Sequence, residues 1–284
     1  MDSIKLEAFA KINLFLEVCE KRPDSYHNID SIMQSVTLCD IVTVKKTNDI
    51  ILSNTANLPN DSSNLAYKAA KLFFEYTGIK SGAEIHIEKN IPISAGLAGG
   101  STDAAAVLKG LNAIYSSRID EDTLCELGAK LGADVPFCIK GGTFQTKGVG
   151  NIFTPCRALP DCRIVISKKG EGVSTPYAYG EIDKLRLNNS TPFKTSTNII
   201  SALSESDITN VCNNVYNIFE TVVCPIRPLV DEQKQILNKH NALCSLMSGS
   251  GPSVFGIFLN NKDAESALAE LQEFGATAYL CNPI

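Results

Sequence analysis

The sequence predicts a two-domain α+β protein. Its 284 residues are 44% apolar, which is enough to bury two ordinary hydrophobic cores. Segments with the period-two alternation of strands and segments with helical spacing follow one another, without a repeat of fixed length. A Pro-containing stretch from Phe153 to Pro160 is the best candidate for a domain boundary. We therefore expect one α+β domain on each side of this stretch.

The first half of the chain is predicted to begin with a sheet and to continue with helices. Apolar residues occupy every second position between Ala8 and Cys19, which predicts a strand. Capping residues up to Asn64 and a glycine at Gly78 bound an amphipathic helix. The remaining elements expected here are strands over 29–44 and 84–91, and helices over 101–115 and 120–131. Residues 133–137 are then expected to turn the chain, which places Asp134 beyond a helix end.

The second half shows the same mixture of patterns. Strands are predicted over 143–150, 163–166, 253–259 and 277–281, and helices over 226–240 and 263–274. This order of elements predicts a second α+β domain.

Composition excludes several classes of function. The 26 Lys and Arg residues against 31 Asp and Glu residues give a net charge of −5, which argues against binding to nucleic acids or to anionic membranes. The 10 cysteines include no Cys-x-x-Cys pair, and the 3 histidines have no metal-ligand spacing. The N-terminus lacks the layout of a signal peptide, and glycine, serine and proline interrupt the longest uncharged run, 241–261. A cytoplasmic location is expected.

The segment from Pro92 to Thr102 is the most informative part of the sequence. Its three glycines let the backbone approach an anion, and the predicted helix after it directs unpaired N–H groups into the loop. Ser101 and Thr102 can cap that helix or contact a phosphate or its metal ion. The loop matches neither the Walker A pattern nor G-x-G-x-x-G. An anion site and a tight strand-to-helix turn both remain open.

Two charged residues are candidates for chemistry. Lys11 shares one face of the first strand with Asn13, and such a polar face is usually exposed to solvent. Phe9 and Phe15 lie on the same face, however, which indicates that it is covered. A partly buried lysine needs an anionic partner. Asp134 is a candidate for this partner, and the alternative is an ordinary turn or capping aspartate.

Two loops are candidates for ligand contacts. The loop Asp24–His27 combines the ring of Tyr26 with the titratable donor of His27, which suits a planar heterocycle, and simple surface decoration is the alternative. The loop Ser248–Pro252 is either a second anion-binding nest or a turn before a strand.

Taken together, four segments resemble the GHMP small-molecule kinase superfamily. In chain order they are Ala8–Leu14, Pro92–Thr102, Gly132–Pro136 and Ser248–Gly251. The resemblance extends over the whole chain, and the joint occurrence of the motifs is more specific than any single loop. The segments that are similar to the members acting on a cytidine-diphosphate-linked methylerythritol are Ala10–Leu16, Arg22–His27, Leu131–Phe137 and Gly172–Thr175.

The resemblance implies a GHMP kinase fold. An N-terminal ATP-binding domain would cover residues 1–152 and a C-terminal α/β sandwich domain residues 153–284. The implied enzyme is an alcohol-acceptor phosphotransferase that uses ATP and Mg²⁺ to phosphorylate the 2-hydroxyl of the cytidine-diphosphate-linked methylerythritol, a step of the non-mevalonate isoprenoid pathway. Its metal ligands are not assigned. The expected partner is this small molecule, bound by a monomer or homodimer, with neither nucleic acid nor membrane involved.

The resemblance also implies a role for individual residues. Asp134 would accept the hydroxyl proton, while Lys11 would orient Asp134, keep it ionised and stabilise the developing charge. The residues that would hold the ATP phosphates are Pro92, Ile93, Ser94, Ala95, Gly96, Leu97, Ala98, Gly99, Gly100, Ser101 and Thr102. The residues that would contact the substrate are Asn13, Tyr26, His27, Ser174 and Thr175.

One departure from the family and two competing interpretations bear on these roles. Ser25 stands where this family usually has glycine, so a left-handed backbone there would cost about 1 kcal/mol. Another GHMP kinase for a different small alcohol is one alternative, and a non-catalytic nucleotide-binding regulator on the same fold is the other. The presence of both Lys11 and Asp134 favours an enzyme. A dinucleotide-dependent oxidoreductase would need a Rossmann fingerprint that the sequence lacks.

Overall fold

The computed structural model describes residues 1–188 and 193–284, which form two compact units that alternate along the sequence. Unit 1 consists of Met1–Ala10, Leu38–Ile93 and Ala98–Gly141. Unit 2 consists of Lys11–Thr37, Ser94–Leu97 and the described part of Gly142–Ile284. Helices and strands occur in both units, so the predicted α+β class is confirmed. The division of the sequence between residues 152 and 153 stays a prediction.

Two long strands contribute residues to both units. They are β1 (Ser3–Lys21) and β2 (His27–Thr47), which are neighbours in one sheet. The first was expected from its alternating apolar residues and the second from its β-rich composition over 29–44, and both extend beyond the predicted ends. Along β1, however, both faces are buried between Ala10 and Val18. The polar face that carries Lys11 is therefore covered, as the neighbouring phenylalanines indicated.

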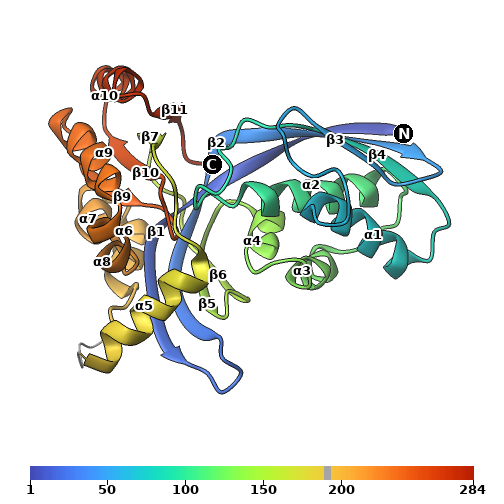
Figure 1. Cartoon of the computed structure of the whole chain (residues 1–284), viewed down its shortest axis with the longest axis horizontal. Helices are drawn as coiled ribbons and strands as arrows, with labels where there is room; N and C mark the ends of the chain where they lie inside the picture. Colours follow the sequence, from blue (N-terminus) through green and yellow to red (C-terminus); the bar gives the residue numbers. More distant parts are fainter. Residues whose placement is uncertain (189–192) are drawn as a thin grey trace. The chain divides into compact units, whose positions relative to one another are not determined.

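Unit 1 packs helices on one face of a sheet. Its further elements are β3 (Ile51–Asn54), α1 (Leu65–Thr77), β4 (Gly82–Glu88), α2 (Gly99–Ile114), α3 (Glu121–Ala129) and α4 (Val135–Lys140). Strand β4 pairs antiparallel with β2 and parallel with β3. Helices α1 and α2 pack on each other and lie along one face of these strands (Figure 1). Val42, Ile85 and Phe73 are fully buried between the two layers.

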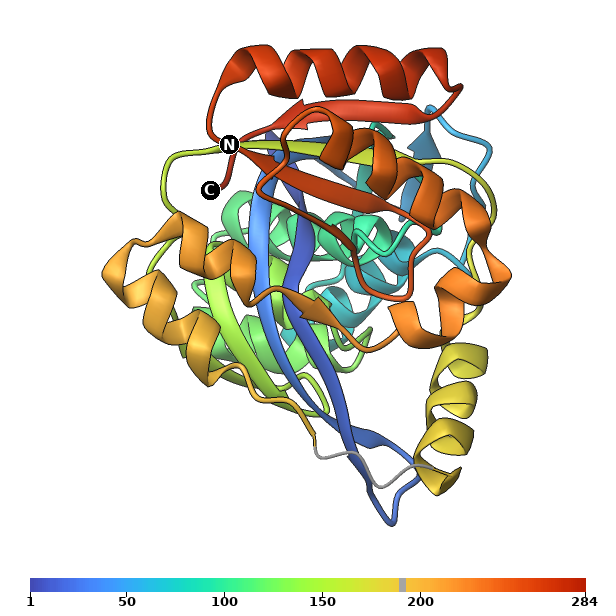
Figure 2. The same cartoon turned by 90° about the vertical axis from the view of Figure 1, so that its left-hand side faces the viewer.

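Unit 2 contains a second sheet. Its elements are β5 (Thr143–Gly148), β6 (Ile152–Pro155), β7 (Arg163–Lys168), α5 (Thr175–Asn188), α6 (Thr197–Glu205), α7 (Ile208–Asn213), β8 (Tyr216–Asn217), α8 (Glu220–Val223), the 3-10 turn Cys224–Ile226, α9 (Pro228–Lys239), β9 (Cys244–Met247), β10 (Val254–Phe258), α10 (Asn261–Glu273) and β11 (Thr277–Cys281). The antiparallel strands of this sheet have the order β11-β7-β10-β9. Helices α9 and α10 lie in front of it in Figure 2. Strand β8 pairs parallel with β1, and β5 pairs antiparallel with β2.

The helix ends confirm one prediction and correct two. Helix α1 begins at the predicted cap, Asn64, whose side chain accepts a hydrogen bond from the Ala66 N–H, and it ends at Gly78 with φ 69°. Helix α2 begins at Gly99 rather than Ser101, because Ala98 adopts a left-handed conformation (φ 61°) and turns the chain earlier. Residues 133–137 do not form a simple turn, since they lead directly into α4. Its proline, Pro136, lies in the first turn, where no N–H partner is needed.

Candidate active site

Lys11 is held on β1 in unit 2 by a chain of polar side chains. Its exposed fraction is 4%, and its Nζ donates to Asn13 Oδ1 at 2.7 Å. Asn13 Nδ2 donates in turn to Ser31 Oγ on β2 at 3.0 Å, and Ser31 Oγ donates to the Phe15 carbonyl at 2.7 Å. The predicted pair Lys11 and Asn13 is thus brought together. Side chains from two strands hold the ammonium group in place, so it is pre-organised to bind an anion.

The tip of the glycine-rich loop, Ser94–Leu97, also belongs to unit 2. The Leu97 carbonyl accepts a hydrogen bond from the backbone N–H of Lys11 at 3.2 Å. Gly96 has φ 75°, and a Cβ atom there would lie 2.1 Å from the Ser248 carbonyl oxygen. Ser248 Oγ donates to the Gly96 carbonyl at 3.0 Å. Only glycine fits this position, because both the backbone angle and the close approach exclude a side chain.

The loop Ser248–Pro252 therefore supports the tip of the first loop. Asn217, which is 2% exposed, donates through Nδ2 to the carbonyls of Met247 at 2.7 Å and of Gly249 at 2.8 Å. The Ser248 N–H donates to the Ser253 carbonyl at 2.9 Å, directly before β10. This geometry is a turn before a strand, one of the two predicted readings. Its contact with Gly96 gives the turn a further purpose.

The other end of the glycine-rich loop lies in unit 1, at the start of α2. Ala98 precedes the helix and has no side-chain oxygen that could accept from the first N–H groups. Thr102 does not cap the helix, since its Oγ1 donates to the Phe9 carbonyl on β1 at 2.7 Å. Of the two roles predicted for Ser101 and Thr102, capping of this helix is therefore not observed, and contact with a phosphate or its metal ion stays a prediction. Without a capping side chain, the first turn can direct its N–H groups and its dipole at an external anion.

Asp134 lies beside this helix start within unit 1. It is half-buried and immediately precedes α4. A Cβ atom at Gly132 would lie 3.9 Å from Ser101 Oγ, and the Val135 N–H donates to the Gly132 carbonyl at 3.2 Å. The turn that carries Asp134 therefore contacts the first turn of α2. Lys11 belongs to unit 2, and the pairing of Lys11 with Asp134 stays a prediction.

The predicted Tyr26 and His27 side chains differ in their surroundings. Tyr26 is 67% exposed, whereas His27 is largely buried and its Nε2 lies 2.6 Å from Asp183 Oδ1. The His27 ring also packs on that of Tyr179, with 5.1 Å between ring centroids. Ser25 has φ 69°, so this serine adopts the left-handed conformation that glycine favours.

Asp183 is the acidic partner of the His27 imidazole. Although partial burial raises its pKa, hydrogen bonds from Lys21 and His27 outweigh burial and hold the pKa of Asp183 below its usual value. Because an ionised carboxylate can only accept hydrogen bonds, the hydrogen bond between the two side chains is donated by the N–H group at His27 Nε2. Neither Asp183 nor Tyr179 was singled out from the sequence. Their spacing of four on α5 was the available signal, but it required the helix to be recognised first.

Ser174 and Thr175 lie at the start of α5. Ser174 Oγ accepts a hydrogen bond from the Tyr177 N–H at 3.3 Å, which is an N-cap arrangement. Thr175 Oγ1 and Ser250 Oγ are 3.3 Å apart. A Cβ atom at Gly172 would lie 3.5 Å from the Ser94 carbonyl oxygen. Unit 2 thus brings together the segment 172–175, the loop tip 94–97 and the loop 248–252.

A metal ion would find few protein ligands here. Among residues 1–188 and 193–284, no group of three or more His, Cys, Asp or Glu side chains has the geometry of a metal site. Mg²⁺ typically takes only one or two protein ligands and completes its shell with phosphate oxygens and water.

Comparison with known proteins shows the family. Residues 64–142 match the family model of the GHMP kinases N terminal domain, and residues 199–277 match that of the GHMP kinases C terminal region. The 4-diphosphocytidyl-2-C-methyl-D-erythritol kinase of Caldicellulosiruptor saccharolyticus is 45% identical over 273 residues, covering 95% of this chain and 93% of that protein. This chain belongs to the 4-diphosphocytidyl-2-C-methyl-D-erythritol kinase family. The protein of the same name from Clostridioides difficile is 43% identical and covers 99% of this chain and 96% of its own length.

Solved structures agree with this assignment. The crystal structure of a 4-(cytidine 5′-diphospho)-2C-methyl-D-erythritol kinase matches with a TM-score of 0.83 and 32% identity, covering 99% of both chains. A mevalonate kinase from L. major shares the fold at a TM-score of 0.75 and 13% identity. The predicted family, fold class and kinase activity are confirmed. Like other GHMP kinases, members of the family are ATP-dependent phosphotransferases with an alcohol acceptor.

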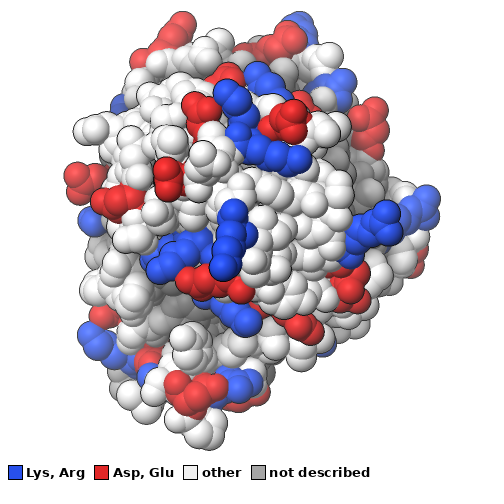
Figure 3. Space-filling view, turned by 90° about the vertical axis from the view of Figure 1, so that its right-hand side faces the viewer, with Lys and Arg blue, Asp and Glu red and all other residues white. Residues whose placement is uncertain are grey.

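Two surface properties complete the description. In the described part of the chain, no helix combines the length and the apolar character that crossing a membrane requires. On the face drawn in Figure 3, Lys and Arg side chains lie interspersed with Asp and Glu.

Proposed function

We propose that this chain transfers the γ-phosphoryl group of ATP to the 2-hydroxyl of 4-diphosphocytidyl-2-C-methyl-D-erythritol, in the non-mevalonate isoprenoid pathway. Relatives of that name match nearly their full length. The structural observation that supports the proposal most is the uncapped start of α2 after a glycine-rich loop whose tip is fixed by Ser248. This is an arrangement built to hold phosphate groups.

The loop would hold the nucleotide phosphates over residues 92–102. Phosphoryl transfer demands mainly alignment and neutralisation of spreading negative charge. Backbone N–H groups at the start of α2 supply such neutralisation without reorganising during the reaction. Mg²⁺, when bound with ATP, would supply further positive charge at the phosphates.

Lys11 and Asp134 would carry the chemistry at the acceptor hydroxyl. Asp134 would accept the proton as the oxygen attacks, and Lys11 would counter the negative charge that develops. Asn13, which binds Lys11 Nζ, would contact the substrate near this hydroxyl. Tyr26 and His27 would bind the cytidine, and the hydroxyls of Ser174 and Thr175 would contact the same substrate. A cytoplasmic location and a monomeric or homodimeric state also stay predictions.

The test is a coupled assay of ADP release with 4-diphosphocytidyl-2-C-methyl-D-erythritol and Mg-ATP. We expect kcat to fall roughly a hundredfold or more in Asp134→Asn and in Lys11→Ala. Asp122→Asn is a matched control, because Asp122 is an exposed carboxylate on α3. Mevalonate, homoserine and galactose should support no comparable turnover. ATP binding without turnover of the cytidine substrate would refute the proposed substrate, and full activity in Asp134→Asn would refute the proposed base.

A further inference from the structure

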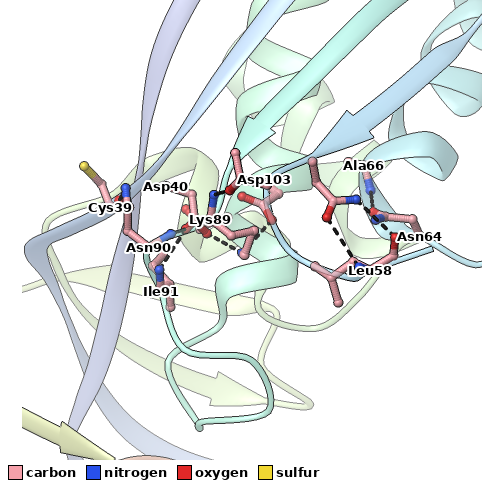
Figure 4. A network of polar contacts seen from close by, with 12 residues as sticks. Cys39, Asp40, Leu58, Asn64, Ala66, Lys89, Asn90, Ile91 and Asp103 are labelled. Carbon is pink, nitrogen blue, oxygen red and sulfur yellow. Dashed lines mark hydrogen bonds and ion pairs between the residues drawn. The ribbon is translucent and has the colours of Figure 1, made fainter. Parts of the chain in front are cut away.

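Unit 1 contains a cluster of three buried charged residues at the two ends of the glycine-rich loop. Lys89, which follows β4, forms ion pairs with Asp40 of β2 and, at 2.8 Å, with Asp103 of α2 (Figure 4). The exposed fractions of the three side chains are 5%, 0% and 5%. Asp40 Oδ1 also accepts the N–H groups of Asn90 at 2.6 Å and Ile91 at 2.8 Å. The Lys89 ammonium group thereby connects β2 with the segment before the loop and with α2 after it.

Stability alone is a poor explanation for this cluster. With both carboxyl groups ionised, the cluster would carry a net negative charge in the core, and burying charges costs more than burying apolar side chains of similar size. Asp103 Oδ1 is buried and has no hydrogen-bond partner among the residues that the structure describes. Burial, together with the Asp40 carboxylate, raises the pKa of Asp103 to about 7 although Lys89 opposes this shift. An apolar cluster at the same place would avoid these costs.

The cluster contacts both arms of the loop, which are residues 89–91 before it and the first two turns of α2 after it. Residues 89–91 enter the loop directly before Pro92, and Asp40 fixes two of their backbone N–H groups to β2. Asp103 lies in the second turn of α2, the helix that leaves the loop. A Cβ atom at Gly99 would lie 3.3 Å from Lys89 Nζ and 3.1 Å from Ile91 Cγ2. The first residue of α2 therefore rests directly on the lysine that binds the other arm.

We propose that Asp40, Lys89 and Asp103 are positioning residues that hold the two arms of the phosphate-binding loop in one fixed geometry. The inference rests on the proposed function of this loop and assigns a role to three residues that the sequence analysis did not single out. Displacement of a reacting group by about 1 Å can cost about a hundredfold in rate. Loosening the arms should therefore weaken ATP binding and slow transfer, while the binding of the cytidine substrate stays unchanged.

The test replaces the charged side chains of the cluster, which connect the two arms of the loop, by uncharged ones. In the triple variant Asp40→Asn/Lys89→Met/Asp103→Leu, the asparagine Oδ1 can still accept the N–H groups of Asn90 and Ile91, and no buried charge of the cluster remains. We expect an increase of tenfold or more in KM for ATP, a lower kcat, and a KM for the cytidine substrate within twofold of wild type. Lys45→Met is the matched control, since Lys45 on β2 pairs with Glu84 at the surface. It should change none of these constants.

The outcomes separate positioning from a merely structural role. A variant that melts normally and keeps the wild-type KM for ATP overturns the inference. If the triple variant does not fold, Asp103→Asn decides in the same way, because it keeps the ion pair of Lys89 with Asp40 and removes only the charge that connects Lys89 to α2. If the wild-type enzyme does not turn over the cytidine substrate, the proposed function fails. The affinity for a non-hydrolysable ATP analogue, measured by calorimetry, then tests the positioning role by itself.

Discussion

Gly96→Ala is the substitution whose effect the structure defines best. The new methyl group would lie 2.1 Å from the Ser248 carbonyl oxygen and 3.2 Å from the Gly251 nitrogen, at a backbone φ of 75°. Gly78→Ala is a matched control, since Gly78 has φ 69° and nothing lies within 4 Å of its Cβ position. Both variants incur the cost of a left-handed alanine, about 1 kcal/mol. Only Gly96→Ala adds steric overlap, typically worth about 1–3 kcal/mol.

Urea denaturation and steady-state kinetics on both variants give the required comparison. Gly96→Ala should lose about 2–4 kcal/mol of unfolding free energy, and Gly78→Ala about 1 kcal/mol. Relief of the overlap needs a shift of the loop tip by roughly 1 Å, so kcat/KM for ATP should also fall by about a hundredfold in Gly96→Ala alone. Equal stability losses in the two variants, with equal ATP kinetics, would refute the argument that Ser248 fixes the tip.

Three further changes test separate parts of the structure. Asp183→Asn should raise KM for the cytidine substrate about tenfold and leave KM for ATP unchanged, because His27 loses a charge-assisted hydrogen bond; initial rates at varied concentrations of each substrate measure this. Ser25→Gly should relieve the left-handed strain at φ 69° and raise the melting temperature, by at most the equivalent of about 1 kcal/mol. Since the pKa of Asp103 is raised to about 7 in the folded chain from 3.8, the folded state binds more protons between these values, and stability should fall as pH rises across this window. Relative to wild type, Asp103→Asn should therefore gain up to about 1.4 kcal/mol per pH unit in that window, as urea denaturation between pH 5 and pH 8 would show.

Local sequence patterns predicted those helices and strands whose position depends on a single local feature, such as apolar alternation or a capping residue. Period-two alternation predicted β1, and the capping residues Asn64 and Gly78 predicted both ends of α1. Helix α5 was missed because, over residues 175–187, only Ala178 and Ile182 are buried. Two buried residues form too narrow an apolar stripe for a helical period to be recognised. The start of α2 was placed too late, since a left-handed alanine rather than a hydroxyl side chain precedes the helix.

Local sequence patterns did not predict the tertiary contacts of the site. Lys11 and Asn13 were found because they share a strand face. Asp40, Lys89 and Asp103 come from three elements, and no spacing in the sequence indicates that they meet. The partnership of His27 with Asp183 likewise joins residues 156 positions apart. Such contacts depend on the packing of whole elements, which a local pattern does not encode.

The buried polar groups near the loop are of two kinds, and the difference separates stability from function. Both polar atoms of the Asn217 side chain are hydrogen-bonded, because Nδ2 donates to two carbonyls and Oδ1 accepts a hydrogen bond from the Phe219 N–H. A satisfied network of this kind stabilises and specifies a fold. The cluster around Lys89 leaves Asp103 Oδ1 unpartnered within the described chain and, with both carboxyl groups ionised, carries a net charge. Its uncharged replacement should therefore preserve or raise thermal stability while ATP affinity falls, and a purely structural cluster would not make these two quantities diverge.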